Sequence, residues 1–254
     1  MGKDIVEVMK GEKVLSLFAD VLGDREARAY IQSVIIAVRS SDSLANCEVT
    51  SIIASALRAA TLRLSVDPSV GHAYLVAYGK KATFLPGYKG YKHMALRTNK
   101  YRYINVGALY EGQTWEMNQL TGVGWIAGTR TGNKVIGRFA YFELLDGYSK
   151  SLYLTLEEIH AHALRYSPSY NVNGAPWKTQ TVAMEMKTVL RLLLMHDGYF
   201  DPCDRLALTV IEEEAVPDDA EITEIAAAVE TQNAQPEPPA AEVDEDQILH
   251  DLGF

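Results

Sequence analysis

A short basic segment, FLPGYKGYKHMALR, runs from Phe84 to Arg97 in a chain whose formal net charge is -9. Its cations could bind the phosphates of a polyanion, or they could line the solvent face of an ordinary amphipathic helix. On a helical wheel, tyrosines and small apolar residues fall on one side and cations on the other: Tyr88, Tyr91, Met94 and Ala95 against Lys89, Lys92, His93 and Arg97. Leu96 interrupts the basic side. Taken alone, this helix favours the amphipathic interpretation.

A second helix, expected from about Thr179 to His196, repeats the arrangement. One face offers a core, with Val182, Ala183, Met186, Leu190, Leu193 and Leu194, and a narrow opposite arc holds Gln180, Met184, Lys187, Arg191 and Met195. Trp177 and Lys178 precede its first turn, where free backbone N–H groups also bind phosphate. Two basic faces, each beside an aromatic residue, suit a groove for single-stranded nucleic acid. Together they favour binding.

Signatures of catalysis are absent from the sequence. The segment GVGWIAGTRTGNKVIG does not supply the phosphate-binding loop of an ATPase, and His160 and His162 would diverge on a helix because i and i+2 do not share a face. The two cysteines, Cys47 and Cys203, have no zinc-like spacing. We therefore expect no enzyme, no cofactor and no metal site. One alternative stays open, a metal-dependent nuclease using strand carboxylates such as Glu111, Glu116, Glu143 and Asp146.

The net charge hides a split within the chain. Fourteen of the 33 acidic residues lie in residues 212–254 and none of the 24 basic ones does, so residues 1–211 carry a formal charge of about +5. Residues 212–241 are predicted to be a disordered acidic linker, because they hold few large apolar side chains. Residues 242–254 regain an apolar tip with Ile248, Leu249, Leu252 and Phe254, which is either a docking peptide or a frayed terminus.

The elements that would position these residues belong to an α+β fold. Two helices are expected between Glu12 and Ala37, broken near Gly23, and a third from about Val49 to Ala60. A hairpin follows, with Pro86 in the first turn of the next helix. The strands YRYINVGALYE, TWEMNQL, KVIGRFAYFELLDG and SKSLYLTL predict an antiparallel β-meander backed by helices, and a capping box at Thr155 and Glu158 opens a further helix. No membrane segment is predicted, and a cytoplasmic protein is expected.

Three segments in this order resemble the RecT family of phage single-strand annealing proteins, which is related to the lambda-type Beta proteins. They are LRAATLRLSVDPSVGHAYLVAYGKKATFLPGYKGYKHMALRT, VGALYEGQTWEM and SPSYNVNGAPWKTQTVAMEMKTVLRLLL. The resemblance covers roughly residues 10–200 and leaves out the tail. It implies ATP-independent annealing of complementary single strands by a homo-oligomeric ring or helical filament. It also implies a β-sheet backed by helices, with DNA in a basic groove.

A DNA-binding and oligomerising annealing core is expected in residues 1–211, and the resemblance assigns candidate DNA contacts within it at the matching positions. The phosphate-contact candidates are Lys89, Lys92, Arg97, Lys178, Lys187 and Arg191, and the aromatic candidates, which could equally be core, are Tyr88, Tyr91 and Trp177. Thr98-Asn99 departs from the family pattern at the end of the first basic helix. Expected partners are single-stranded DNA and the annealed duplex intermediate. The tail would recruit a host single-strand binding protein or a phage exonuclease. A structural virion protein is the weaker alternative, because it would leave the basic faces without a purpose.

Overall fold

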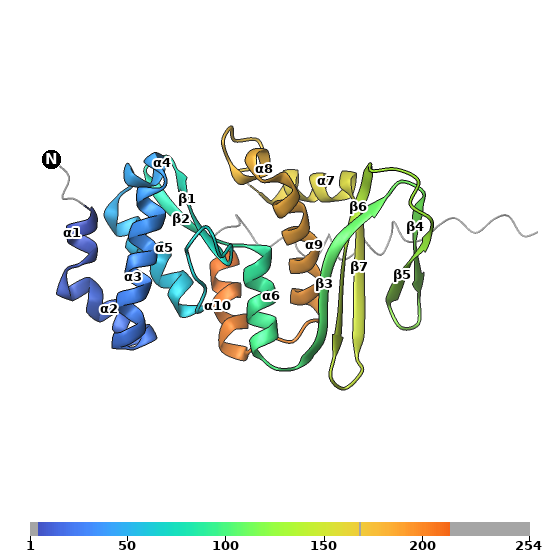
Figure 1. Cartoon of the computed structure of the whole chain (residues 1–254), viewed down its shortest axis with the longest axis horizontal. Helices are drawn as coiled ribbons and strands as arrows, with labels where there is room; N and C mark the ends of the chain where they lie inside the picture. Colours follow the sequence, from blue (N-terminus) through green and yellow to red (C-terminus); the bar gives the residue numbers. More distant parts are fainter. Residues whose placement is uncertain (1–4, 168, 214–254) are drawn as a thin grey trace, which may run out of the picture. The chain divides into compact units, whose positions relative to one another are not determined.

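Helices begin the chain, strands occupy its middle and helices follow again in the computed structural model (Figure 1). The structure describes residues 5–167 and 169–213. The chain divides after Ile211, and residues 1–211 form the larger unit. This order, with antiparallel sheets, confirms the α+β class. The predictions for the tail, residues 212–241 and 242–254, lie outside the described residues. The exception is residues 212 and 213, which end the last helix.

From residue 5 onward, five helices come before the first strand: α1 (Ile5–Met9), α2 (Glu12–Leu22), α3 (Asp24–Arg39), α4 (Asp42–Ala45) and α5 (Val49–Thr61). Helices α2 and α3 are separate because Gly23 adopts φ +83°, which a residue with a side chain rarely takes. Their apolar faces bury residues such as Phe18 and Ile31 in the core. The Tyr30 hydroxyl donates to the Leu64 carbonyl at 2.8 Å and ties α3 to the segment after α5. The predicted break and the third helix are confirmed.

The first hairpin leads directly into the first basic helix. Strands β1 (Ala73–Tyr78) and β2 (Lys81–Pro86) pair antiparallel, and α6 (Tyr88–Arg97) follows. The placement of Pro86 in the first turn of α6 is wrong: it pairs with Ala73 at the end of β2, and Gly87 is the N-cap. The ladder extends this far because the Gly87 N–H still donates to the His72 carbonyl at 2.8 Å.

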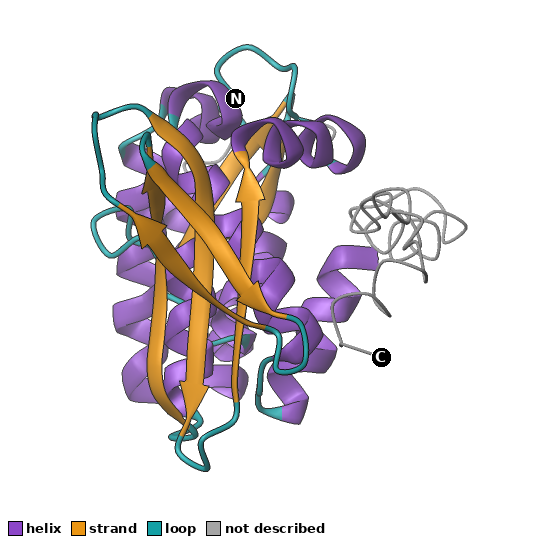
Figure 2. Cartoon of the chain, turned by 90° about the vertical axis from the view of Figure 1, so that its right-hand side faces the viewer, coloured by secondary structure: helices purple, strands orange, loops and turns teal. Residues whose placement is uncertain are grey.

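The main sheet has three antiparallel strands in the order β3-β6-β7: β3 (Tyr101–Tyr110), β6 (Val135–Leu144) and β7 (Ser149–Thr155). Strand β3 pairs with β6 rather than with the next strand, because β4 (Gln113–Asn118) and β5 (Val123–Gly128) form a separate hairpin between them. The Trp115 ring on β4 stacks on Phe139 of β6 and Tyr153 of β7, so this hairpin packs on the main sheet. Figure 2 shows the strands of the main sheet and of the β4–β5 hairpin in front of most of the helices.

The remaining helices are α7 (Leu156–Tyr166), α8 (Pro176–Thr179), α9 (Thr181–Asp197) and α10 (Pro202–Glu213). The predicted capping box is confirmed: Thr155 Oγ1 accepts from the Glu158 N–H, and the Glu158 carboxylate accepts from the Thr155 N–H. Helices α7 and α9 both pack on strands β6 and β7. Helix α10 was not expected, although the Asp201 carboxylate accepts from the Cys203 N–H and Pro202 opens the helix.

Candidate nucleic-acid interface

Helices α6 and α9, the two elements with predicted basic faces, contact each other (Figure 1). They share a core between them, in which Met94 and Ala95 of α6 and Leu190 and Leu194 of α9 are buried. The fold therefore brings together two basic helices that lie about a hundred residues apart in the sequence.

Helix α6 stands unusually close to the chain that precedes β1. A Cβ atom added at Gly90 would lie 2.2 Å from the His72 carbonyl oxygen, so the helix can approach this backbone only with glycine at that position. Lys89 and His93 are exposed and Lys92 is partly exposed. The GYKG motif therefore packs its second glycine inward and directs cations to the surface.

A stacked histidine pair lies beside the cations of α6. The His72 and His93 rings have their centroids 4.4 Å apart. Burial lowers the pKa of His72, and the charges of His93 and Lys89 lower it further. Burial also lowers the pKa of His93, with a further decrease from Arg97 that Asp204 opposes. Burial is therefore the largest cause of both pKa shifts, and the neighbouring cations add to it.

Arg97 has a different environment from the lysines of α6. Its guanidinium binds both carboxylate oxygens of Asp204 on α10, with Nε at 3.2 Å from Oδ2, and Nη1 donates to the Leu62 carbonyl at 2.7 Å. Its side chain is only 25% exposed, and that of Asp204 is 9% exposed. Arg97 therefore joins α6, α10 and the end of α5, and we leave it out of the proposed interface.

The aromatic candidates also lie mostly inside the fold. Tyr91 is 1% exposed and Trp177 is 4% exposed, whereas Tyr88 is partly buried and packs against the core. Buried rings of this kind have no free face for a nucleotide base in this conformation. We therefore carry forward only Tyr88 among the three as an aromatic residue of the interface.

The cations around α9 are more accessible. Lys178 is exposed and its ammonium lies 5.0 Å from the centroid of the Tyr170 ring, while Lys187 and Arg191 are partly exposed. Burial lowers the pKa of His162 on α7 to about 4, and the charge of Arg191 contributes to the decrease. Arg191 is thus close enough to α7 for its charge to act on that helix.

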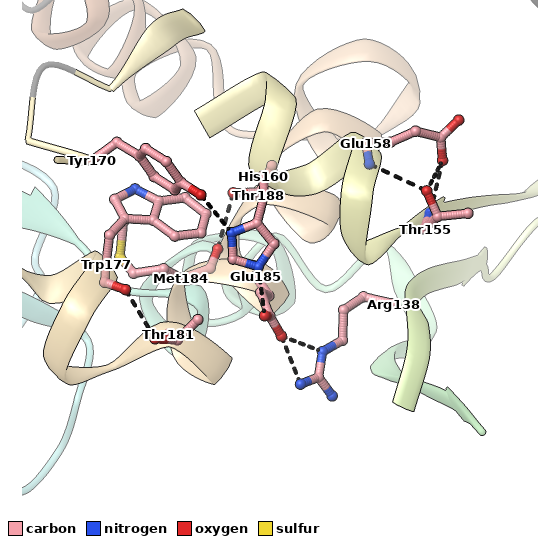
Figure 3. A network of polar contacts seen from close by, with 10 residues as sticks. All are labelled: Arg138, Thr155, Glu158, His160, Tyr170, Trp177, Thr181, Met184, Glu185 and Thr188. Atoms are coloured by element: carbon pink, nitrogen blue, oxygen red, sulfur yellow. Dashed lines mark hydrogen bonds and ion pairs between the residues drawn. The ribbon is translucent and has the colours of Figure 1, made fainter. Parts of the chain in front are cut away.

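The core face expected for α9 is wrong in two positions. Val182 is 53% exposed, and Glu185, which the apolar pattern did not include, is 5% exposed. Glu185 is buried because Arg138 of β6 binds it from the sheet, with Nε and Nη2 at 2.8 and 2.7 Å from Oε2 (Figure 3). The signal in the sequence is Arg138 as the single charge of the apolar segment VIGRFAYF, and Glu185 among the apolar residues of MEMKTVL, where Lys187 is the other charge.

The two histidines of α7 diverge, as their spacing predicted. His160 contacts Glu185 and Tyr170, whereas His162 lies against Tyr166, with ring centroids 4.7 Å apart. In residues 5–167 and 169–213, no group of three or more His, Cys, Asp or Glu side chains is arranged to hold a metal ion. Among those same residues, none of the helices is both long enough and apolar enough to cross a membrane.

Comparison with known proteins identifies the family of the chain. The chain is 35% identical over 236 residues to YqaK of Bacillus subtilis, an uncharacterized protein, covering 92% of this chain and 81% of YqaK. It is 25% identical over 169 residues to protein RecT of Escherichia coli, covering 63% of this chain and 62% of RecT. Residues 28–228 match the RecT family, and both basic helices lie within this range. Because the match spans most of the chain, the protein belongs to the RecT family.

Proposed function

We propose that this protein binds single-stranded DNA and anneals complementary strands without ATP. Membership of the RecT family supports a role in recombination by single-strand annealing. The observation that carries the proposal to this chain is the contact between α6 and α9, two helices from distant segments that each carry exposed or partly exposed cations. The proposed phosphate contacts are Lys89, Lys92, Lys178, Lys187 and Arg191, with Tyr88 beside them.

Annealing requires two phosphate chains to approach each other while their base edges stay free. Cations that contact the backbone reduce the repulsion between the strands and carry no sequence information. Sequence is then read by base pairing alone. The exposed ends of Lys89 and Lys178 and the partly exposed Lys92, Lys187 and Arg191 suit this role, because they reach solvent from helices whose other faces are fixed in the core.

Assembly is the second part of the proposal. Family membership implies oligomerisation, and we propose a ring or a helical filament in which neighbouring copies continue the basic surface. Binding of a host single-strand binding protein or a phage exonuclease through residues 242–254 stays a prediction from the sequence.

The direct test is the rate at which two complementary, dye-labelled oligonucleotides pair with and without the protein. We expect acceleration in the absence of any nucleotide and no further increase on adding ATP with Mg²⁺. The same samples, run on a denaturing gel after incubation with Mg²⁺ or Mn²⁺, would show full-length strands. Shortened strands would support the nuclease alternative, and unaccelerated pairing by a protein that still binds DNA would leave a passive binder.

A further inference from the structure

A series of polar contacts leads from the main sheet to Tyr170 (Figure 3), and the Tyr170 ring in turn contacts the Lys178 ammonium. Its base is the buried ion pair between Arg138 on β6 and Glu185 on α9, whose side chains are 7% and 6% exposed. His160 on α7 joins the pair through Nε2, which lies 3.2 Å from Glu185 Oε1. Three elements of the fold therefore meet at one carboxylate, and both of its oxygens are hydrogen-bonded.

The carboxylate fixes which way the next hydrogen bond runs. An ionised carboxylate only accepts, so the Nε2 of His160 carries the hydrogen that faces Glu185. In the neutral ring Nδ1 is then an acceptor, and the Tyr170 hydroxyl, 2.9 Å away, donates to it. The buried pair thus orients Tyr170 through His160.

Tyr170 is the side chain that connects this network to the surface segment between α7 and α8. Its ring lies under the Lys178 ammonium, 5.0 Å from Nζ, and meets the Trp177 ring edge-on at a centroid distance of 5.4 Å. Residues 171–174 are exposed, and the backbone hydrogen bonds of Val172 and Ala175 close only local turns. The segment therefore relies on side-chain contacts such as that of Tyr170 for its attachment to the fold.

We propose that Tyr170 is a positioning residue for Lys178 in single-strand binding, an inference that rests on the proposed function. A lysine side chain loses considerable rotamer freedom when its ammonium must meet a phosphate. The Tyr170 ring holds that ammonium beforehand by a cation–π contact, and the hydroxyl holds the ring through His160 and Glu185. A lysine placed in advance binds phosphate with less loss of freedom.

The test is a double-mutant cycle on the full chain with Tyr170→Leu, Lys178→Gln and both together. Affinity for a labelled mixed-sequence single strand is measured at several salt concentrations, and the melting temperature of each variant is recorded. We expect each single change to weaken binding roughly 2- to 5-fold. Lys178→Gln should reduce the magnitude of the slope of log K against log salt by about 0.7, which corresponds to one phosphate contact, whereas Tyr170→Leu, which keeps the cation, should leave the slope nearly unchanged. The double variant should be no weaker than either single one.

Two further variants separate the parts of the proposal. Tyr170→Phe keeps the ring and loses the hydroxyl, so it should give a smaller loss of affinity than Tyr170→Leu. Tyr110→Leu is the matched control: its ring carries the Arg130 guanidinium at 3.6 Å in another part of the fold, and its removal should leave affinity unchanged. If Tyr170→Leu lowers the melting temperature strongly, Tyr170→Phe replaces it in the cycle.

Additive losses in the double variant would overturn the proposal, because Tyr170 would then act independently of Lys178. Full affinity in Lys178→Gln would also overturn it while leaving the proposed function intact. If the unmodified protein bound no single-stranded DNA, the proposed function itself would fail, and this inference with it.

Discussion

Helices α6 and α9 share a basic amphipathic pattern in the sequence, but they differ in which charged side chains are buried in the fold. In α6 the buried side is made only of glycine, tyrosine, methionine and alanine, and the last cation, Arg97, turns to Asp204 and Leu62. In α9 the buried side contains Glu185, and the cations Lys187 and Arg191 stay partly exposed. A basic amphipathic helix therefore does not reveal which cations face solvent, because an opposite charge from elsewhere in the chain decides it.

The partners explain the difference between the two helices. Asp204 lies 107 residues from Arg97 along the chain, in a helix that follows both basic elements, and Arg138 lies 47 residues from Glu185. On α6 the helix carries the cation, Arg97, and α10 supplies the anion. On α9 the helix carries the anion, Glu185, and the sheet supplies the cation. The first arrangement takes Arg97 out of the exposed cations of α6, whereas in the second the buried pair belongs to a helix whose Lys187 and Arg191 are partly exposed.

The largest expected effect concerns the buried pair under α9. Glu185→Ala would leave Arg138 buried without its counter-charge, which costs about 3–5 kcal/mol in the free energy of unfolding. Urea denaturation followed by circular dichroism measures this change. The double variant Arg138→Met/Glu185→Leu, which removes both charges, should recover much of the loss, and an equal loss in the double variant would contradict the account.

A smaller loss of stability is expected when the ion pair between Arg97 of α6 and Asp204 of α10 is broken. Asp204→Ala removes the acceptor of two guanidinium hydrogen bonds, but Arg97 is 25% exposed and can still be solvated and keep the Leu62 carbonyl. We expect a decrease of about 1.5–3 kcal/mol in the free energy of unfolding. Asp201→Ala, which removes the carboxylate that caps α10, is the matched comparison. A loss larger than that of Glu185→Ala would reverse the ranking of the two helices.

The smallest effect is a pH dependence next to α9. The pKa of His162 is lowered from 6.5 to about 4, so the unfolded chain binds its proton at a higher pH than the folded one. The contribution of His162 to the free energy of unfolding is therefore fully present above about pH 6.5 and is lost as the pH falls toward about 4.

When the pH falls from about 7 to about 5.5, this contribution to the free energy of unfolding decreases by about 1 kcal/mol. His162→Gln should remove that part of the pH dependence, measured as the change in urea midpoint. His93→Gln on α6 should remove less, because the lowering there is opposed by Asp204. Equal effects of the two variants would mean that both surroundings act alike on their histidines.

Local signals in the sequence predicted most elements of the fold correctly. The Gly23 break, the capping box of Thr155 and Glu158 and the antiparallel strands depend on neighbouring residues, and all three are confirmed. The pairing of β3 with β6 depends instead on the hairpin inserted between them, which periodicity does not encode. Helix α10, which the expected elements do not include, has its own signal in Asp201 and Pro202.

The candidate site was predictable as a set of residue types, and the partners of those residues were not. Helical spacing separated Lys89 and Lys92 from the buried Tyr91 correctly. It gave no means of seeing that Arg97 meets Asp204, or that Trp177 is enclosed between His160 and Tyr170. These contacts join segments that are brought together only by the complete fold.

The most direct measurement is the pairing rate of complementary oligonucleotides, without nucleotide, for the unmodified protein and for three variants. Lys89→Gln/Lys92→Gln tests α6, Lys187→Gln/Arg191→Gln tests α9, and the third variant combines all four changes. We expect each double substitution to reduce the magnitude of the slope of log K against log salt by about 1.4. The variant with all four changes should no longer accelerate pairing and should retain its melting temperature. Acceleration undiminished in the four-fold variant would contradict the claim that the two basic helices hold the DNA strand.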